Sequence, residues 1–63
     1  MSDKTLEAAR RAKFTVNTLL NELQQVNRHD SALVSMCILP EIGKAAQIKA
    51  GLGILIDALE REN

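Results

Sequence analysis

The spacing of apolar side chains between residues 3 and 27 constrains the fold of this chain more than any other feature. The apolar residues recur there at alternating intervals of three and four: Ala9, Ala12, Val16, Leu19, Leu23 and Val26. This heptad spacing is typical of an α-helix that packs along one seam, whereas a strand would alternate every second residue. Ser2 or Asp3 can cap the first N–H groups, and Glu7 suits the positive end of the helix dipole. We therefore predict a helix over about 3–27.

A second heptad pattern lies near the C-terminus, and it predicts a long helix over about 40–61. Its apolar positions are Ala45, Ile48, Leu52, Leu55 and Leu59. Small residues recur on the other side: Gly43, Ala46, Ala50 and Gly53. A phosphate-binding glycine loop would need a third glycine at position 56, where Ile56 stands, and a preceding strand. Because each mid-helix glycine costs about 1 kcal/mol relative to alanine, we interpret the glycines as points where another helix backbone approaches closely.

The middle of the chain predicts a turn over residues 27–31, followed by an ambiguous apolar segment. Asn27 can end the first helix, and Asp30 or Ser31 can cap the next one. A helix that follows so short a turn is an antiparallel neighbour of the preceding helix. The apolar run over 32–39 fits a helix or a strand, and we favour a short helix over about 31–38. Pro40 then introduces a kink, although one continuous helix bent at Pro40 is an open alternative.

The length of the chain, 63 residues, predicts one small domain that needs a partner. A domain of this size buries only about 60% of its unfolded surface. The single cysteine, Cys37, excludes an intrachain disulfide, and Cys37 with His29 gives too few ligands for structural zinc. We therefore predict an all-α helical hairpin over residues 1–63, with its second arm kinked near Pro40, that dimerises into a four-helix-type bundle or a higher oligomer. The predicted dimer interface consists of Ala45, Ile48, Leu52, Gly53, Leu55 and Leu59.

The charge balance and the absence of reactive groupings narrow the classes of function. Eight basic residues balance eight acidic ones, whereas a dedicated nucleic-acid binder usually carries a basic excess. The N-terminal residues lack the apolar core of a signal peptide, and no apolar stretch approaches the roughly 18 residues that span a bilayer. No catalytic, metal-binding or cofactor-binding motif is present. We expect a cytoplasmic protein with no enzymatic activity, no cofactor and no membrane partner.

Phe14, the only aromatic residue of the chain, is the strongest candidate for contact with a partner. On a helical wheel it lies opposite the heptad stripe, among Arg10, Asn17 and Asn21. An aromatic anchor surrounded by arginine and asparagine suits an interaction hot spot. The alternative is that the last helix covers Phe14, or that it is exposed without a role. We predict that Arg10, Phe14, Asn17 and Asn21 form a docking face.

The stretch ARRAKFTVNTLLNELQQVN, residues 9–27, resembles the first helix of the plasmid RNA-binding Rop family. The shared features are the Ala12–Lys13–Phe14 step, the aliphatic seam, the short acidic turn and the total length. The resemblance implies a dimer of helical hairpins whose first helices present an outward Phe to paired RNA loops. It would assign RNA contacts to Lys4, Arg10, Phe14 and either Thr18 or Asn21. The glycines and the proline of the second half depart from that family's pattern.

These observations predict a small regulatory or adaptor protein that binds a macromolecular partner as a helical dimer. In general style, a small helical chain without catalytic groups also resembles the accessory early-region proteins of lambdoid bacteriophages. The alternative function is Rop-like RNA binding through the same face of the first helix. An amphipathic protein of the membrane surface is disfavoured because the polar faces are not rich in lysine or arginine.

Overall fold

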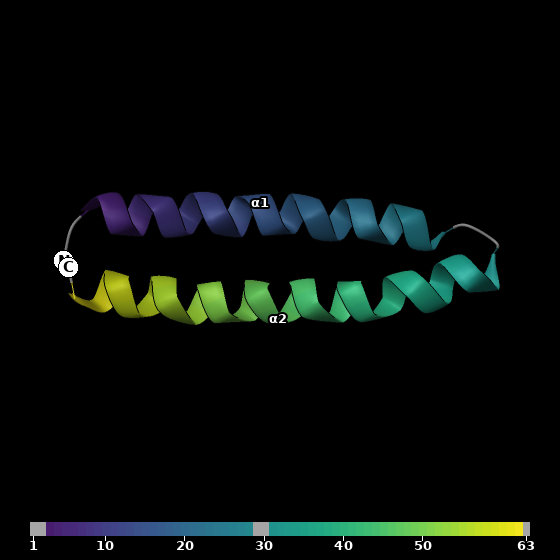
Figure 1. Cartoon of the computed structure of the whole chain (residues 1–63). Helices are drawn as coiled ribbons and strands as arrows, with labels where there is room; N and C mark the ends of the chain where they lie inside the picture. Colours follow the sequence, from purple (N-terminus) through teal and green to yellow (C-terminus); the bar gives the residue numbers. More distant parts are fainter. Residues whose placement is uncertain (1–2, 29–30, 63) are drawn as a thin grey trace.

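The computed structural model describes residues 3–28 and 31–62, which form two long antiparallel α-helices (Figure 1). The first helix, α1, spans Asp3–Asn27, and the second, α2, spans Ala32–Glu62. They lie side by side along their whole length, so the start of α1 and the end of α2 meet at one end (Figure 1). The molecule is a rod with extents of 47 × 14 × 10 Å. The predicted helical hairpin is therefore confirmed.

A serine caps the start of α2. The backbone N–H of Val34 donates a hydrogen bond to Ser31 Oγ at 3.4 Å, and the N–H of Ser35 donates to the Ser31 carbonyl oxygen at 3.1 Å. The bond from Val34 satisfies an N–H group that has no partner inside the helix, as expected of an N-cap serine, and the bond from Ser35 is the first of the regular helical series. Ser31 thus takes one of the two capping positions predicted for this turn. The remaining predicted capping groups lie outside the described residues and side chains: Ser2, Asp3 and Asp30.

One continuous helix stands in place of the two that the sequence predicted over 31–38 and 40–61. Pro40 lies in the interior of α2 and cannot donate the backbone hydrogen bond that the Met36 carbonyl would normally accept. Residues before and after the proline contact α1, with Ile38 half-buried and Ala45 only 3% exposed. Because packing on both sides holds one helical register, the segment 32–39 is helical and α2 passes through Pro40 without a break.

The buried core is thin and lies toward the open end of the hairpin. The buried apolar residues among those described are Leu6, Ala9, Val16, Ala45, Ile56 and Leu59. Four of them form one cluster, in which Leu6 and Ala9 of α1 pack with Ile56 and Leu59 of α2. No described side chain is less than 2% exposed. A core of this size leaves a chain of this length marginally stable as a monomer.

The predicted packing of α1 along a single seam is wrong for half of that seam. Ala9 and Val16 are each 6% exposed, as a seam against α2 requires, but Leu19 is 46% and Val26 is 47% exposed. Alternate heptad positions project to opposite sides of the seam, so one partner helix covers only one of the two sets. The inner edge of α1 is completed instead by Leu6, which lies outside the predicted stripe.

Candidate interaction surfaces

Phe14 projects from α1 into solvent, with 74% of its surface exposed. The four residues predicted to form a docking face follow one another at intervals of four, three and four, which places them on one side of a helix. Asn21 is exposed and Asn17 is half-buried. One turn beyond Phe14, the Thr18 hydroxyl donates a hydrogen bond to the Phe14 carbonyl oxygen at 3.2 Å. Arg11, one turn before Phe14, is also exposed, so the described surface around Phe14 is an aromatic ring with polar neighbours that include a cationic one.

Arg10, the fourth predicted docking residue, is paired with α2. Its Nη2 donates to Glu60 Oε2 at 2.6 Å, and the two side chains are 55% and 46% exposed. An exposed ion pair of this kind contributes about 0–1 kcal/mol. Arg10 thus links the two helices near the open end, and its charge is largely balanced within the hairpin.

A set of exposed apolar side chains lies along one side of the hairpin, and we name it the apolar flank. It consists of Ala12, Leu19 and Val26 from α1 with Ile48 and Leu55 from α2. Ala12 is exposed, and the exposed fractions of the larger side chains are between 44% for Leu55 and 55% for Ile48. Because successive helical residues are about 100° apart, Leu19 lies about 140° around α1 from Phe14. The apolar flank and Phe14 therefore face different directions.

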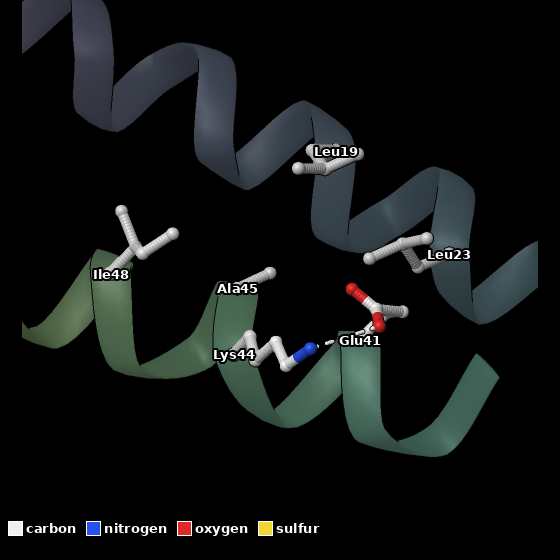
Figure 2. Close-up of a pocket in the computed structure, with 6 residues that line it drawn as sticks. All are labelled: Leu19, Leu23, Glu41, Lys44, Ala45 and Ile48. Atoms are coloured by element: carbon white, nitrogen blue, oxygen red, sulfur yellow. Dashed lines mark hydrogen bonds and ion pairs between the residues drawn. The ribbon is translucent and has the colours of Figure 1, made fainter. Parts of the chain in front are cut away.

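The centre of the apolar flank is an open groove of about 310 Å³ between the helices (Figure 2). Leu19 and Leu23 project from α1 toward Ala45 and Ile48 of α2 (Figure 2). At the edge of the groove, Lys44 Nζ donates to Glu41 Oε1 at 3.2 Å. Because these two charges pair with each other, the groove offers hydrophobic contact without a net charge.

The hairpin itself uses much of the dimer interface that was predicted from the sequence. Ala45 and Leu59 are 3% and 4% exposed, so both face α1. Leu52 and Gly53 are half-buried, and a Cβ on Gly53 would lie 3.9 Å from Lys13 Nζ of α1. Of the predicted interface residues, Ile48 and Leu55 remain available to a second chain.

The sequence interpretation missed the contribution of α1 to this surface. Ala12, Leu19 and Val26 were assigned to the seam inside the hairpin, and they are exposed instead. The signal that could have identified them is their own spacing, seven residues apart. A set with that spacing marks one edge of a heptad stripe, which can serve a helix other than the hairpin neighbour.

The side of α2 that points away from α1 is a second apolar surface, which we name the outer face. It comprises Leu33, Met36, Pro40, Gly43, Gln47, Gly51 and Ile54. Leu33 and Ile54 are each 70% exposed and Met36 is 72% exposed. Ile54 lies about 160° around α2 from the buried Ile56. The outer face is thus an apolar surface opposite the one that packs on α1.

The glycines of the outer face have open space above them. A Cβ placed on Gly43 or Gly51 would meet no heavy atom within 4 Å. No contact inside the hairpin therefore requires glycine at either position. The sequence grouped Gly43 with Gly53, but the half-buried Gly53 faces Lys13 while Gly43 faces solvent.

The metal-binding side chains, the apolar character of the helices and the comparison with known proteins assign no further site or family. In residues 3–28 and 31–62, no group of three or more His, Cys, Asp or Glu side chains could hold a metal ion. Neither of the two helices, as far as they are described, has the length and apolar character needed to cross a membrane. The chain matches no family model, no curated protein and no solved structure.

Proposed function

We propose that this chain is a small non-enzymatic regulatory or adaptor protein that binds a macromolecular partner as a helical dimer. In this proposal a second copy packs on the apolar flank, and the partner binds the surface around Phe14. The observation that carries the proposal is the separation of the two surfaces on α1. Phe14 is 74% exposed on one side, and Leu19 is 46% exposed on another. A second copy can therefore cover the flank while Phe14 stays accessible.

The dimer is supported by the dimensions and composition of the apolar flank. The side of the rod that carries the apolar flank measures about 47 × 14 Å between Cα atoms. A second hairpin that covers this whole side, with the polar residues around the flank, would bury an area comparable with the roughly 800 Å² that each partner buries in a standard stable interface. Leu19 and Ile48 already occupy heptad positions, so a second hairpin would convert them into the core of a four-helix bundle. Such burial would supply the apolar contact that the thin core of the hairpin lacks.

The docking face is supported by the exposure and surroundings of Phe14. A large aromatic side chain held in water gains stabilisation when a partner covers it, and asparagine or threonine neighbours can supply hydrogen bonds at the rim. Phosphate recognition depends instead on accessible cationic groups. Arg10 is paired with Glu60, so Arg11 is the arginine beside Phe14 whose charge no described ion pair balances. One such charge is fewer than phosphate recognition usually employs, which supports a protein partner. Rop-like RNA binding through the same face is the alternative.

The dimer can be tested by sedimentation equilibrium at low micromolar concentration. We expect the wild-type chain to be a dimer, and Leu19→Glu to be a monomer because it places a charge in the apolar flank. Thr18→Glu is the matched control, since it adds the same charge to an exposed position off the flank. A folded wild-type monomer under these conditions would contradict the proposed dimer.

The docking face can be tested by capture from a cell lysate, with and without nuclease. Phe14→Ala should weaken capture of the partner by at least about 2 kcal/mol, the usual cost of removing a hot-spot anchor. Leu39→Ala is the matched control, because it truncates an exposed apolar side chain of α2 that lies in neither the apolar flank nor the outer face. Protein bands that survive nuclease support the adaptor, whereas loss on nuclease treatment and steep weakening with salt support RNA. Equal capture by wild type and Phe14→Ala would exclude this face as the docking site.

A further inference from the structure

The outer face of α2 is covered neither by the hairpin nor by the proposed dimer on the apolar flank. Leu33, Met36 and Ile54 expose 70–72% of their surface on it. A helix that is apolar on opposite sides is usually covered on both, and an extended exposed apolar patch commonly marks an interaction site. The inner side of α2 has its partner in α1, so the outer face still lacks one.

The charges of α2 indicate what kind of occupant fits the outer face. Between Leu33 and Ile54 the nearest charged residue is Lys44, at the edge of this face, and it is paired with Glu41 at 3.2 Å. Anionic lipid or nucleic acid would need a set of cationic side chains that this face does not carry. An uncharged apolar helix is complementary to it, and α2 of a second copy is such a helix.

The arrangement of residues along the outer face fits pairing with itself. When two identical helices pack antiparallel about a two-fold axis, residues equally far from the axis lie opposite each other. An axis at Gln47 places Gly43 opposite Gly51 of the other copy, and Pro40 opposite Ile54. The same axis places Lys44 opposite Ala50, so no two like charges are brought together.

The residues near this axis also fit a close helix crossing. Glycine in the middle of a helix destabilises it relative to alanine, and the open space above Gly43 and Gly51 shows that the hairpin does not require them. At a crossing, glycines let the two backbones approach closely. Gln47 is exposed, and its amide both donates and accepts hydrogen bonds, so two copies of it can pair across the axis.

We propose that the outer face of α2 is a second self-association surface, occupied by α2 of another copy in an antiparallel crossing centred on Gln47. A contact centred on Gln47 extends equally to both sides, from Pro40 to Ile54, which is about 21 Å along the helix. Because a helix is about 10 Å wide, this contact is less than half of a standard stable interface. Association through the outer face is therefore weaker than dimerisation through the flank. As the concentration rises, two dimers formed through the apolar flank then associate through their outer faces into a tetramer.

A charge exchange at the axis tests this crossing directly. In Gln47→Lys alone, or in Gln47→Glu alone, two like charges meet at the axis, and each variant should weaken the tetramer at least about tenfold. An equimolar mixture of the two variants should regain it, because opposite charges then meet. Sedimentation velocity over a range of concentrations measures the effect. The substitutions lie on the surface, so the melting temperature of the hairpin should stay near that of wild type.

A second variant separates association from folding. Gly51→Leu adds a side chain where the hairpin has open space, so the hairpin should remain folded. The added side chain would hold the two α2 backbones apart, and the tetramer should be lost. Gly51→Ala, with a much smaller side chain, should weaken the tetramer less.

Different experimental results would contradict the outer-face proposal and the proposed dimer on the apolar flank. Leu19→Glu removes the flank contact but not the outer face, so this variant should still form dimers at high concentration, and combining it with Gln47→Lys should abolish them. A wild-type chain that remains a dimer at every concentration up to about 1 mM would overturn the outer-face proposal and leave the flank dimer standing. If Gln47→Lys and Gln47→Glu associate no better when mixed than each does alone, the outer-face proposal is also overturned.

Discussion

The two helices pack against each other on their inner sides, but they differ in what they present to solvent. The outward side of α1 is polar around one exposed aromatic residue, with Arg11 and Thr18 exposed one turn from Phe14 and Gln25 exposed about three turns further along. The outward side of α2 is apolar over a length of several turns. Contacts within the hairpin explain the composition of α1, because one side packs and the other is hydrated. The same contacts explain only the inner side of α2, because the apolar outer face has no partner within the hairpin.

The distribution of charge repeats this contrast. α2 has no charged residue over 32–40 or over 50–56, whereas the charges of α1 include Lys4, Glu7, Arg11 and Glu22. An uncharged exposed segment in a small chain increases the tendency to associate. The difference indicates that α1 is suited to face water, while α2 is suited to be covered on more than one side.

The largest effect should separate the inner and outer sides of α2. Leu59→Ala should cost about 2–5 kcal/mol of unfolding free energy, because Leu59 is 4% exposed and its loss leaves a cavity in the core. Leu33→Ala makes the same truncation at a residue that is 70% exposed, and it should cost less than about 0.5 kcal/mol. Urea denaturation at low micromolar concentration measures both. Equal costs would mean that the outer face is covered in the stable unit.

Pro40→Ala should stabilise α2 by about 1–3 kcal/mol. Alanine restores the backbone N–H that the Met36 carbonyl can accept, and a proline inside a helix costs about 3 kcal/mol. A thermal melt followed by circular dichroism at 222 nm measures the change. A decrease in melting temperature would indicate that a bend at Pro40 is required for α2 to follow α1.

Gly51→Ala should raise the stability of the hairpin by about 0.5–1 kcal/mol, the usual gain when alanine replaces glycine inside a helix. The added Cβ would have no heavy atom within 4 Å, so no clash offsets the gain. The same melt measures it, at a concentration low enough to keep association through the outer face negligible. A loss of stability would show that Gly51 is covered even in the smallest folded unit.

Much of this contrast could be predicted from the sequence, because helix periodicity and turn residues act locally. The heptads predicted both helices, and Ser31 caps α2 at one of the two predicted positions. The continuity of α2 through Pro40 could not be settled, because it depends on packing against α1 on both sides of the proline.

The orientation of each stripe was harder to predict, because it depends on which edge the neighbouring helix covers. Leu19 and Leu23 look equivalent in sequence, yet Leu19 is 46% exposed while Leu23 is half-buried. The exposed position of Phe14 was predictable, since it lies opposite the stripe whichever edge is buried. The pairing of Arg10 with Glu60 joins residues far apart in the chain, and spacing along one helix could not predict it.

The smallest effect on stability should come from Phe14→Ala, although it removes the largest side chain on the outward side of α1. Phe14 is 74% exposed, so truncation deletes few contacts, and alanine is the better helix former. Unfolding free energy should change by less than about 0.5 kcal/mol, whereas Leu6→Ala in the core cluster of the same helix should cost about 2 kcal/mol or more. Parallel denaturation of the two variants measures the difference. If Phe14→Ala melts as early as Leu6→Ala, Phe14 belongs to a buried interface, and its side of α1 would resemble the outer face of α2.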